Sequence, residues 1–319
     1  MTLSSVWKAA GAGLLGLVLA ASAHAQTAPV RKVEPQQVSP SAWFVQGDTA
    51  LGTSANRNFI SNAGFVVTPA GVVVIDALGS PQLARELLDA IARITPQPVT
   101  HVVITHYHAD HVYGLQEFRK RGARIVAHRG ALEYIHSDTA ASRLQASRAE
   151  LGPWIDAQTE LVVPDQWLDG PGELLVGGTR LVLQPVGPAH TPEDLVVFLP
   201  SERVLFAGDL VFRGRVPFVG QADSRQWIVA LDTLVKMDPR VVVPGHGAMS
   251  TSALADLELT RDYLSFLRQA MGTAARDMEP FEDAYARTDW SRFEKLPLFK
   301  AANRMNAYNT YLLMERQAR

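Results

Sequence analysis

The stretch that decides how this chain is organised is residues 100–111, Thr100-His-Val-Val-Ile-Thr-His-Tyr-His-Ala-Asp-His111. Residues 102–104 are apolar and β-branched, which predicts a buried strand. Residues 112–120 have the pattern of a beginning helix. Between the predicted strand and helix stand four potential metal ligands: His106, His108, Asp110 and His111. We therefore expect these side chains to converge on a tight loop at the edge of a sheet.

The ligand types and their spacing indicate a catalytic metal site. Imidazole nitrogens and carboxylate oxygens suit zinc, manganese or iron, and a catalytic zinc keeps one position open for water. His106 and His108 are one residue apart and can hold one ion from the same loop, while Asp110 and His111 can begin a second site. Unrelated surface or core histidines are the alternative, but they do not explain this density of ligands behind a buried strand.

The first 25 residues have the pattern of a cleavable secretory signal. Lys8 supplies the positive charge, residues 9–23 are mostly apolar, and Ala23-His-Ala25 matches a small-x-small cleavage site before Gln26. The apolar run is short for a membrane span, which needs about 20 residues. We therefore expect a periplasmic protein whose mature chain has no membrane span, rather than one held by an uncleaved anchor.

Composition narrows the class of protein further. The chain has 319 residues, a hydrophobic fraction of 47% and a net charge of −2, which is typical of a globular protein. Lys and Arg form no basic block, so nucleic acid is not an expected partner, and a small-molecule substrate is. Cysteine is absent, so any metal site must be built without thiolates.

Strands and helices alternate along the chain, which predicts α/β layers. Three later strand ends carry further candidate ligands. His190 lies in a loop rich in Pro and Gly, between strands predicted at 180–184 and 195–199. Asp209 ends an apolar strand, and His246 stands between two glycines after another. Together with the first loop, these positions make seven candidate metal ligands.

Several nearby residues have two interpretations. Asp76 ends a buried strand, so it could cap a turn or orient the histidine loop, and the sequence favours neither. Tyr107 and Tyr113 could donate to an oxyanion, but packing is the expected role for each. His128 and His136 lie outside the ligand spacing and are not expected to bind metal.

The pattern of strands is interrupted once and then replaced by helices. Residues 131–151 predict one helix inside an insertion, and Trp154 and Trp167 are expected to pack this insertion onto the body. Near the end of the chain, residues 254–267 and 298–317 predict helices, and residues 271–297 look irregular. The expected organisation is a signal at 1–25, a domain at 26–250 with an insertion at about 130–167, and a helical extension at 251–319 packed on it.

The order His-x-His-x-Asp-His, then His, Asp and His, resembles the metallo-β-lactamase superfamily over about residues 43–247. The resemblance implies a four-layer αββα sandwich with the metals at one edge of its packed sheets. It also implies two metal ions, expected to be zinc, with iron or manganese as alternatives. His106, His108 and His190 would hold one ion, Asp110, His111 and His246 would hold the other, and Asp209 would bridge them.

The resemblance further implies a hydrolase that attacks a carbonyl with a hydroxide bridging the two metals, which Asp110 would orient. Many β-lactamases of this superfamily have Cys or Ser where Asp209 stands. Asp209 instead matches the glyoxalase II-like ligand set, shared with lactonases and other ester or thioester hydrolases. The layout resembles exported SoxH-like and quinoprotein-relay-associated hydrolases. We therefore expect an ester, thioester or lactone as the substrate.

Three other functions stay open at this point. They are β-lactam hydrolysis, a mononuclear iron persulfide dioxygenase that uses a His-His-Asp subset of the same ligands, and a non-catalytic binding protein on a hydrolase scaffold. Substrate contacts are expected from the insertion and from the loop after Asp209. The candidates in that loop are Phe212, Arg213, Arg215 and Phe218. Arg215 could bind a carboxylate of the substrate or pair with a surface acid, and the second is expected.

Overall fold

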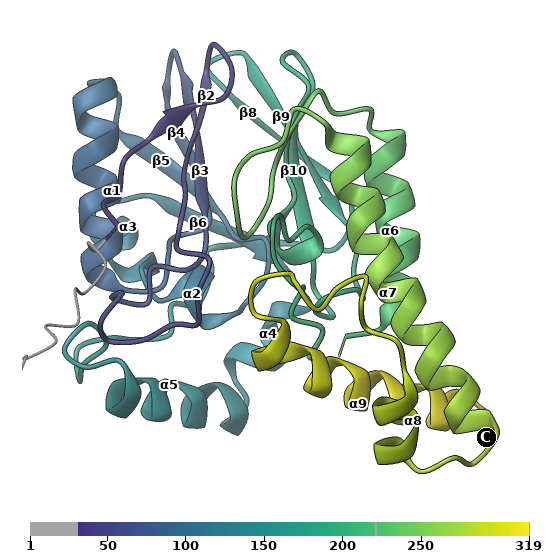
Figure 1. The fold of residues 1–319 in the computed structure, drawn as a ribbon. Coiled ribbons are helices and arrows are strands. Elements are labelled where there is room, and N and C mark those ends of the chain that lie inside the picture. Colours follow the sequence, from purple (N-terminus) through teal and green to yellow (C-terminus); the bar gives the residue numbers. More distant parts are fainter. Residues whose placement is uncertain (1–30, 221, 319) are drawn as a thin grey trace, which may run out of the picture. The chain divides into compact units, whose positions relative to one another are not determined.

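The computed structural model describes residues 31–220 and 222–318, so the signal expected at residues 1–25 lies outside the described residues. The described residues belong to a single compact unit built on two β-sheets. Figure 1 shows the sheets side by side, with helices on their outer faces.

The first sheet has seven strands, which are hydrogen-bonded in chain order. They are β1 (Gln36–Gln37), β2 (Ala42–Val45), β3 (Ala63–Thr68), β4 (Gly71–Ile75), β5 (Val99–Val103), β6 (Arg124–His128) and β7 (Gln166–Leu168). Strands β1 to β4 pair antiparallel, and β4 to β7 pair parallel. Parallel neighbours need a crossover, which α1 (Pro81–Ile94) provides between β4 and β5. The helix begins where Ser80 accepts a hydrogen bond from the Leu83 N–H.

The second sheet has five strands in the order β12-β11-β10-β9-β8. They are β8 (Gly172–Val176), β9 (Thr179–Pro185), β10 (Leu195–Leu199), β11 (Val204–Phe206) and β12 (Val241–Val243). Only β11 and β12 pair parallel among these strands, and α6 (Ser224–Lys236) makes the crossover between them. Asp223 caps α6 by accepting hydrogen bonds from the N–H groups of Arg225 and Gln226.

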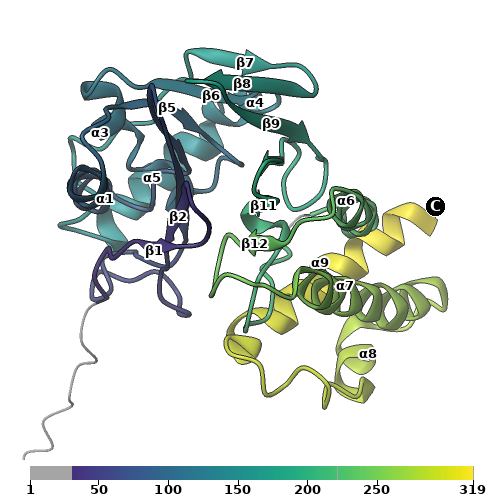
Figure 2. The same ribbon diagram turned by 90° about the horizontal axis from the view of Figure 1, so that it is seen from above.

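The two sheets pack face to face between two layers of helices. Val66 and Val103 from the first sheet share a buried apolar cluster with Leu183 and Val197 from the second. On the outer faces, α1 and α3 (Leu115–Lys120) cover the first sheet, and α6 and α7 (Ala253–Arg276) cover the second, as Figure 2 shows from above. Each fully buried Val or Leu stabilises this arrangement by about 1.5–3 kcal/mol. The expected four-layer αββα sandwich is confirmed.

The C-terminal helices extend the outer layer of the second sheet. They are α7, α8 (Phe281–Arg287) and α9 (Phe299–Ala318). Leu264 of α7, Ala307 of α9 and Phe293 of the segment between α8 and α9 are buried in one cluster with Trp227 of α6. Within the described part of the chain, no helix combines the length and the apolar character needed to cross a membrane.

Two expectations about helices are wrong. The single helix expected at 131–151 is two helices, α4 (Ala131–Ile135) and α5 (Asp138–Glu150). The break occurs because the Ser137 hydroxyl accepts the Ala140 N–H and so begins a new helix. The segment 271–297 is largely ordered, since α7 continues to Arg276 and α8 follows. Met271 and Ala274 continue the buried stripe of α7, which stabilises its last turns.

Candidate metal centre

All seven predicted ligand side chains meet at one edge of the sandwich. The loop between β5 and α2 (Ala109–Val112) and the start of that helix supply the four ligands from His106 to His111. The loop between β9 and β10 supplies His190, and the short 3₁₀ helix η1 (Gly208–Leu210) after β11 supplies Asp209. His246 follows β12. Ligands from both sheets therefore converge on one place.

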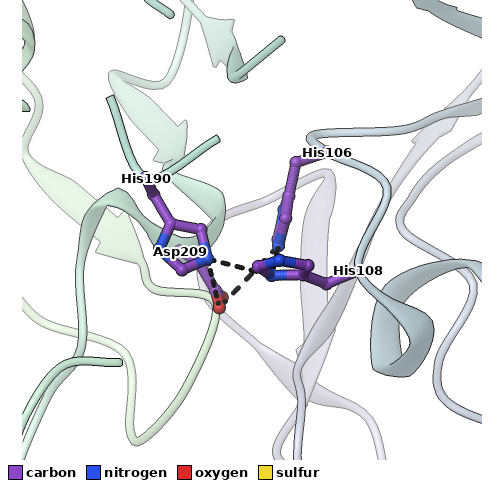
Figure 3. Close-up of side chains that lie close together, drawn as sticks. All are labelled: His106, His108, His190 and Asp209. Carbon is purple, nitrogen blue, oxygen red and sulfur yellow. Dashed lines mark hydrogen bonds and ion pairs between the residues drawn. The ribbon is translucent and has the colours of Figure 1, made fainter. Parts of the chain in front are cut away.

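The first ligand group consists of His106, His108, His190 and Asp209. Figure 3 shows two histidines reaching in from one side, and His190 and Asp209 from the other. His108 Nδ1 lies 3.1 Å from His106 Nε2 and 3.0 Å from His190 Nε2. Asp209 Oδ2 lies 3.4 Å from His190 Nε2 and 3.8 Å from His106 Nε2.

These distances fit a metal ion. Nitrogen ligands about 2.0–2.1 Å from a tetrahedral zinc stand roughly 3.3 Å apart, close to the spacings in the first ligand group. A hydrogen-bonded cluster is a poorer explanation, because the single Nδ1 atom of His108 has either one N–H or one lone pair to share between two close imidazoles. A cation that accepts the lone pairs of all three histidines satisfies every one of them.

The second ligand group consists of Asp110, His111 and His246. Asp110 Oδ2 lies 3.3 Å from His246 Nε2 and 3.6 Å from His111 Nε2. Asp209 also reaches this group, since its two oxygens each lie 3.2 Å from one of these Nε2 atoms. His111 Nε2 and Asp209 Oδ1 are buried without a hydrogen-bond partner among the described residues. Such orphaned ligand atoms fit a cation between them.

Asp76 orients one histidine of each ligand group. Its Oδ2 lies 2.9 Å from His111 Nδ1 and accepts a hydrogen bond from the Thr105 hydroxyl at 2.8 Å. Thr105 Oγ1 in turn lies 3.0 Å from His106 Nδ1. A proton on each Nδ1 leaves each Nε2 lone pair facing the site. The structure thus decides between the two interpretations of Asp76 in favour of the orienting role.

Asn62 fixes the loop of His246, and the sequence analysis missed it. Its side-chain amide donates to Pro244 O and Gly247 O, each at 2.8 Å. These bonds tie the start of β3 in the first sheet to the end of β12 in the second. The residue gives no signal in the sequence because its partner Pro244 lies 182 positions later in the chain.

Two glycines allow the backbone to approach the ligands closely. Gly208 has φ +53°, and an added Cβ would lie 2.8 Å from Thr105 Cβ. At Gly245 an added Cβ would lie only 2.0 Å from Asp209 Oδ1. A side chain at either position would displace a residue of the metal centre.

The protonation of the ligands also suits a cation. Burial lowers the pKa of His190 to about 3 and lowers the pKa values of His106 and His108, so these imidazoles are neutral near pH 7. Burial alone would raise the pKa of Asp209, but His246 and His111 hold it well below its usual value.

His111 differs from these three histidines. Burial alone would lower its pKa, but the carboxylates of Asp209, Asp110 and Asp76 together hold it well above the usual value. Without a cation, the surplus of carboxylates therefore favours a proton on this imidazole. A metal ion would take the place of that proton.

Other aromatic and histidine residues are placed as packing groups. The Tyr107 hydroxyl donates to Val162 O at 2.9 Å, and the Tyr113 hydroxyl lies 3.4 Å from Ser147 Oγ. Both side chains are buried, which confirms the packing role expected for them. Trp154 donates to Ser54 O and so fastens the insertion to the body. Trp167, on β7, packs against the core of the first sheet. His128 and His136 belong to neither ligand group.

The loop after Asp209 is arranged differently from the expectation. Phe212 is buried and stacks on His246 with ring centroids 5.1 Å apart, and Arg213 pairs with Asp256 at 3.0 Å. The expectation that Arg215 pairs with a surface acid is wrong, because this residue is only 5% exposed and makes no ion pair with a described residue. Phe218 is 38% exposed.

Comparison with known proteins gives one family. A family model described as the metallo-β-lactamase superfamily matches residues 56–246. A type 2 metallo-β-lactamase from Bacillus sp. (strain 170) is 26% identical over 223 residues, covering 68% of this chain and 77% of that protein. A linear primary-alkylsulfatase from Pseudomonas sp. (strain ATCC 19151) is 23% identical over 237 residues, covering 63% of this chain and 45% of that protein. The solved metallo-β-lactamase from Pontibacter korlensis has a TM-score of 0.57 and 26% identity, covering 73% of this chain and 99% of that one.

Proposed function

Because the chain belongs to the metallo-β-lactamase superfamily, we propose that it is a dinuclear-metal hydrolase that cleaves an ester, thioester or lactone carbonyl. The observation that supports this most is the convergence of two ligand groups on the shared carboxylate of Asp209. His106, His108 and His190 would hold one ion. Asp110, His111 and His246 would hold the other. Zinc is the expected metal, because the ligands are imidazoles and carboxylates.

When bound, the cations supply Lewis acidity and lower the pKa of water so that it can attack near neutral pH. Asp110 is the proposed catalytic residue of the chain. Its carboxylate is 17% exposed, which leaves it accessible from solvent beside the ligands. It can accept a hydrogen bond from the attacking water and so orient the water toward the carbonyl. Asp76 keeps His111, and through Thr105 also His106, in the tautomer that presents Nε2 to the metal.

Metal analysis combined with a substrate panel tests this proposal. We expect about two zinc ions per chain and turnover of a thioester, lactone or aryl ester that chelation abolishes. Iron near one ion per chain, together with oxidation of a persulfide, would support the mononuclear iron dioxygenase instead. A purified chain that binds no transition metal would overturn the proposal.

β-Lactam hydrolysis is the second candidate, and the relatives named as metallo-β-lactamases favour it. It would use the same attack by water on a carbonyl. The carboxylate at Asp209 favours the ester, thioester and lactone class over it. The test is to measure kcat/KM for a panel of β-lactams and an alkyl sulfate beside the ester panel. The ratio of these values decides which of the two candidate functions is preferred.

We also propose that the protein is exported to the periplasm with removal of residues 1–25. The supporting observations are the charge at Lys8, the apolar run and the small-x-small site before Gln26. Fractionation and intact mass measurement of the expressed protein test this. A mature chain that begins at Gln26 in the periplasmic fraction is expected, and an intact chain in the cytoplasm would contradict it.

A further inference from the structure

The loop of residues 213–220 borders the metal centre. The ring of Phe218 lies 6.3 Å from the ring of His108 and 6.4 Å from that of His190. Burial lowers the pKa of Arg215, and the nearby carboxylates of Asp209 and Asp110 offset only part of that effect. The loop therefore places the ring of Phe218 beside the first ligand group and the guanidinium of Arg215 near Asp209 and Asp110.

Asn306 of α9 holds this loop. Its side chain is fully buried, and its Oδ1 accepts a hydrogen bond from the Val219 N–H at 2.9 Å. Its Nδ2 donates to Pro217 O at 2.7 Å and to the Tyr263 hydroxyl at 2.9 Å. Both faces of the amide are thus satisfied, two of its bonds by the loop and one by α7. A buried donor or acceptor without a hydrogen bond lowers stability, so these bonds favour the loop position that satisfies the amide.

A second attachment comes from the segment before α9. The Val216 N–H donates to Pro297 O at 3.1 Å. Backbone groups of residues 216, 217 and 219 are therefore all bound by residues 297–306. This part of the chain lies beyond residues 56–246, which the family model matches. The C-terminal helices thus contribute to the metal-bearing edge, although they supply none of the seven ligands.

Arg215 is largely buried and forms no ion pair with an acid of the described residues, although Asp209 and Asp110 lie near it. Its Nε donates to Val216 O, and its guanidinium carbon lies 5.3 Å from the ring of Phe212. Its two terminal nitrogens donate to no group of the described residues and are not among the fully buried polar atoms, so a ligand can reach them. Buried charges in proteins are normally paired, and a guanidinium matches the two oxygens of a carboxylate or the face of a sulfate. The two terminal nitrogens of Arg215 are therefore available to bind an oxyanion of a ligand.

We propose that the C-terminal helices form one wall of the substrate site, and that Asn306 is a positioning residue for it. Through Asn306, α9 holds the 213–220 loop so that Arg215 binds a carboxylate or sulfate group of the substrate and Phe218 covers its apolar part. This inference rests on the proposed hydrolase function. It adds the substrate class, which is an acidic, partly apolar ester, thioester or lactone.

Two matched variants test the attachment without using activity. Asn306→Leu removes the bonds to the loop. Asn303→Leu is the control, because Asn303 is equally buried on α9 and bonds to the Tyr263 and Tyr285 hydroxyls but to no loop residue. Hydrogen exchange of peptides covering 216–220 should be at least about tenfold faster in Asn306→Leu than in wild type or Asn303→Leu. Equal exchange in the two variants would overturn the attachment. Asn306→Ser takes the same test if Asn306→Leu does not fold.

Kinetics on a matched pair of substrates test the role of Arg215. The pair is an aryl ester with a remote carboxylate and the same ester with that carboxylate methylated. Arg215→Met and Asn306→Leu should each lower kcat/KM for the acidic ester by about 10- to 100-fold, the range for a lost charge-assisted hydrogen bond. The loss of kcat/KM on the neutral ester should be smaller in both variants, because that ester has no carboxylate for Arg215 to bind. Asn303→Leu should change neither value.

Each outcome of this experiment has one meaning. Equal losses on both esters would overturn the anion-binding role of Arg215. If Asn306→Leu kept the wild-type ratio of kcat/KM between the acidic and the neutral ester, the positioning role of Asn306 would be overturned. Absence of hydrolysis by the metal-loaded wild type would count against the proposed function, and the exchange measurement would still decide whether α9 holds the loop.

Discussion

Asp209 lies within 4 Å of histidines from both ligand groups, so its loss should affect both metal ions. We expect Asp209→Ala to lower bound metal well below two ions per chain and to remove turnover. His106→Ala should do the same, because it removes a ligand of the first group. Metal analysis by mass spectrometry and initial rates measure both effects.

His136→Ala is the control for these two variants. His136 is exposed and belongs to neither ligand group, so metal content and rate should stay at the wild-type values. A His106→Ala protein that kept full turnover would show that the ligand assignment is wrong.

Asp76 should matter for metal affinity without touching a metal itself. Asp76→Asn keeps the size of the side chain but weakens its acceptor for His111 and Thr105. Metal affinity should fall about 10- to 100-fold, the usual cost of losing an orienting carboxylate. Titration with a competing chelator measures it.

Glu117→Gln is the matched control for Asp76→Asn. Glu117 is a buried carboxylate of α3 that pairs with Lys120 and Arg85 instead of a ligand. Its loss should change stability but leave metal affinity within about twofold. If both variants lost metal affinity to a similar extent, the orienting role of Asp76 would be contradicted.

Site residues could be predicted from the sequence where a metal-binding residue type stands at the end of a predicted strand. The seven ligands could be chosen because each follows an apolar strand and each is a residue type that binds metals. The environment of Arg215 could not be predicted, because its loop is held by Asn306, 87 positions after Val219. Asn62 and Asn306 escaped for the same reason, since their partners are backbone groups of distant segments.

At the scale of single elements, the cap of α6 is a local contribution to stability. Asp223 accepts hydrogen bonds from two N–H groups of the first turn, and Trp227 of that turn donates to Leu210 O beside the metal centre. Asp223→Ala should lower the free energy of unfolding by about 1 kcal/mol. Asp223→Asn retains an acceptor oxygen and should cost less. Urea unfolding of the three proteins measures the difference, and equal stabilities would show that the cap is not needed.

Elements with a strong local signal were predicted closely. The spacing of Leu83, Leu87, Leu88 and Ile91 predicts a helix over residues 81–94, and α1 spans those residues. The break between α4 and α5 was missed because Ser137 competes with a helical pattern that continues past it. Helix α8 was missed because it is short and its buried residues, Phe281 and Ala284, depend on α7 and α9 for packing.

At the scale of the molecule, the metal centre joins the two sheets. The first sheet supplies four ligands and the second supplies His190, Asp209 and His246. Metal binding should therefore stabilise the packing of the sheets, by about 2.7 kcal/mol when free metal is 100 times its Kd. Chelation should lower the melting temperature by about 2–4 °C for each kcal/mol lost.

Differential scanning calorimetry with and without chelator measures this effect. The Asp209→Ala protein is the control, because chelator should shift its melting temperature much less than that of wild type. An equal shift in both proteins would mean that the metal binds elsewhere.

The attachment of the 213–220 loop to α9 has a practical consequence for anyone who trims this gene. A fragment that stops just after His246 would encode every ligand and the whole region matched to the family, and it would look complete by any motif criterion. It would nevertheless lack the helix that bonds to Val219 and Pro217. Such a fragment would also lose α7 and expose the apolar face of the second sheet that this helix covers, so the motif is a poor guide to where the folded unit ends.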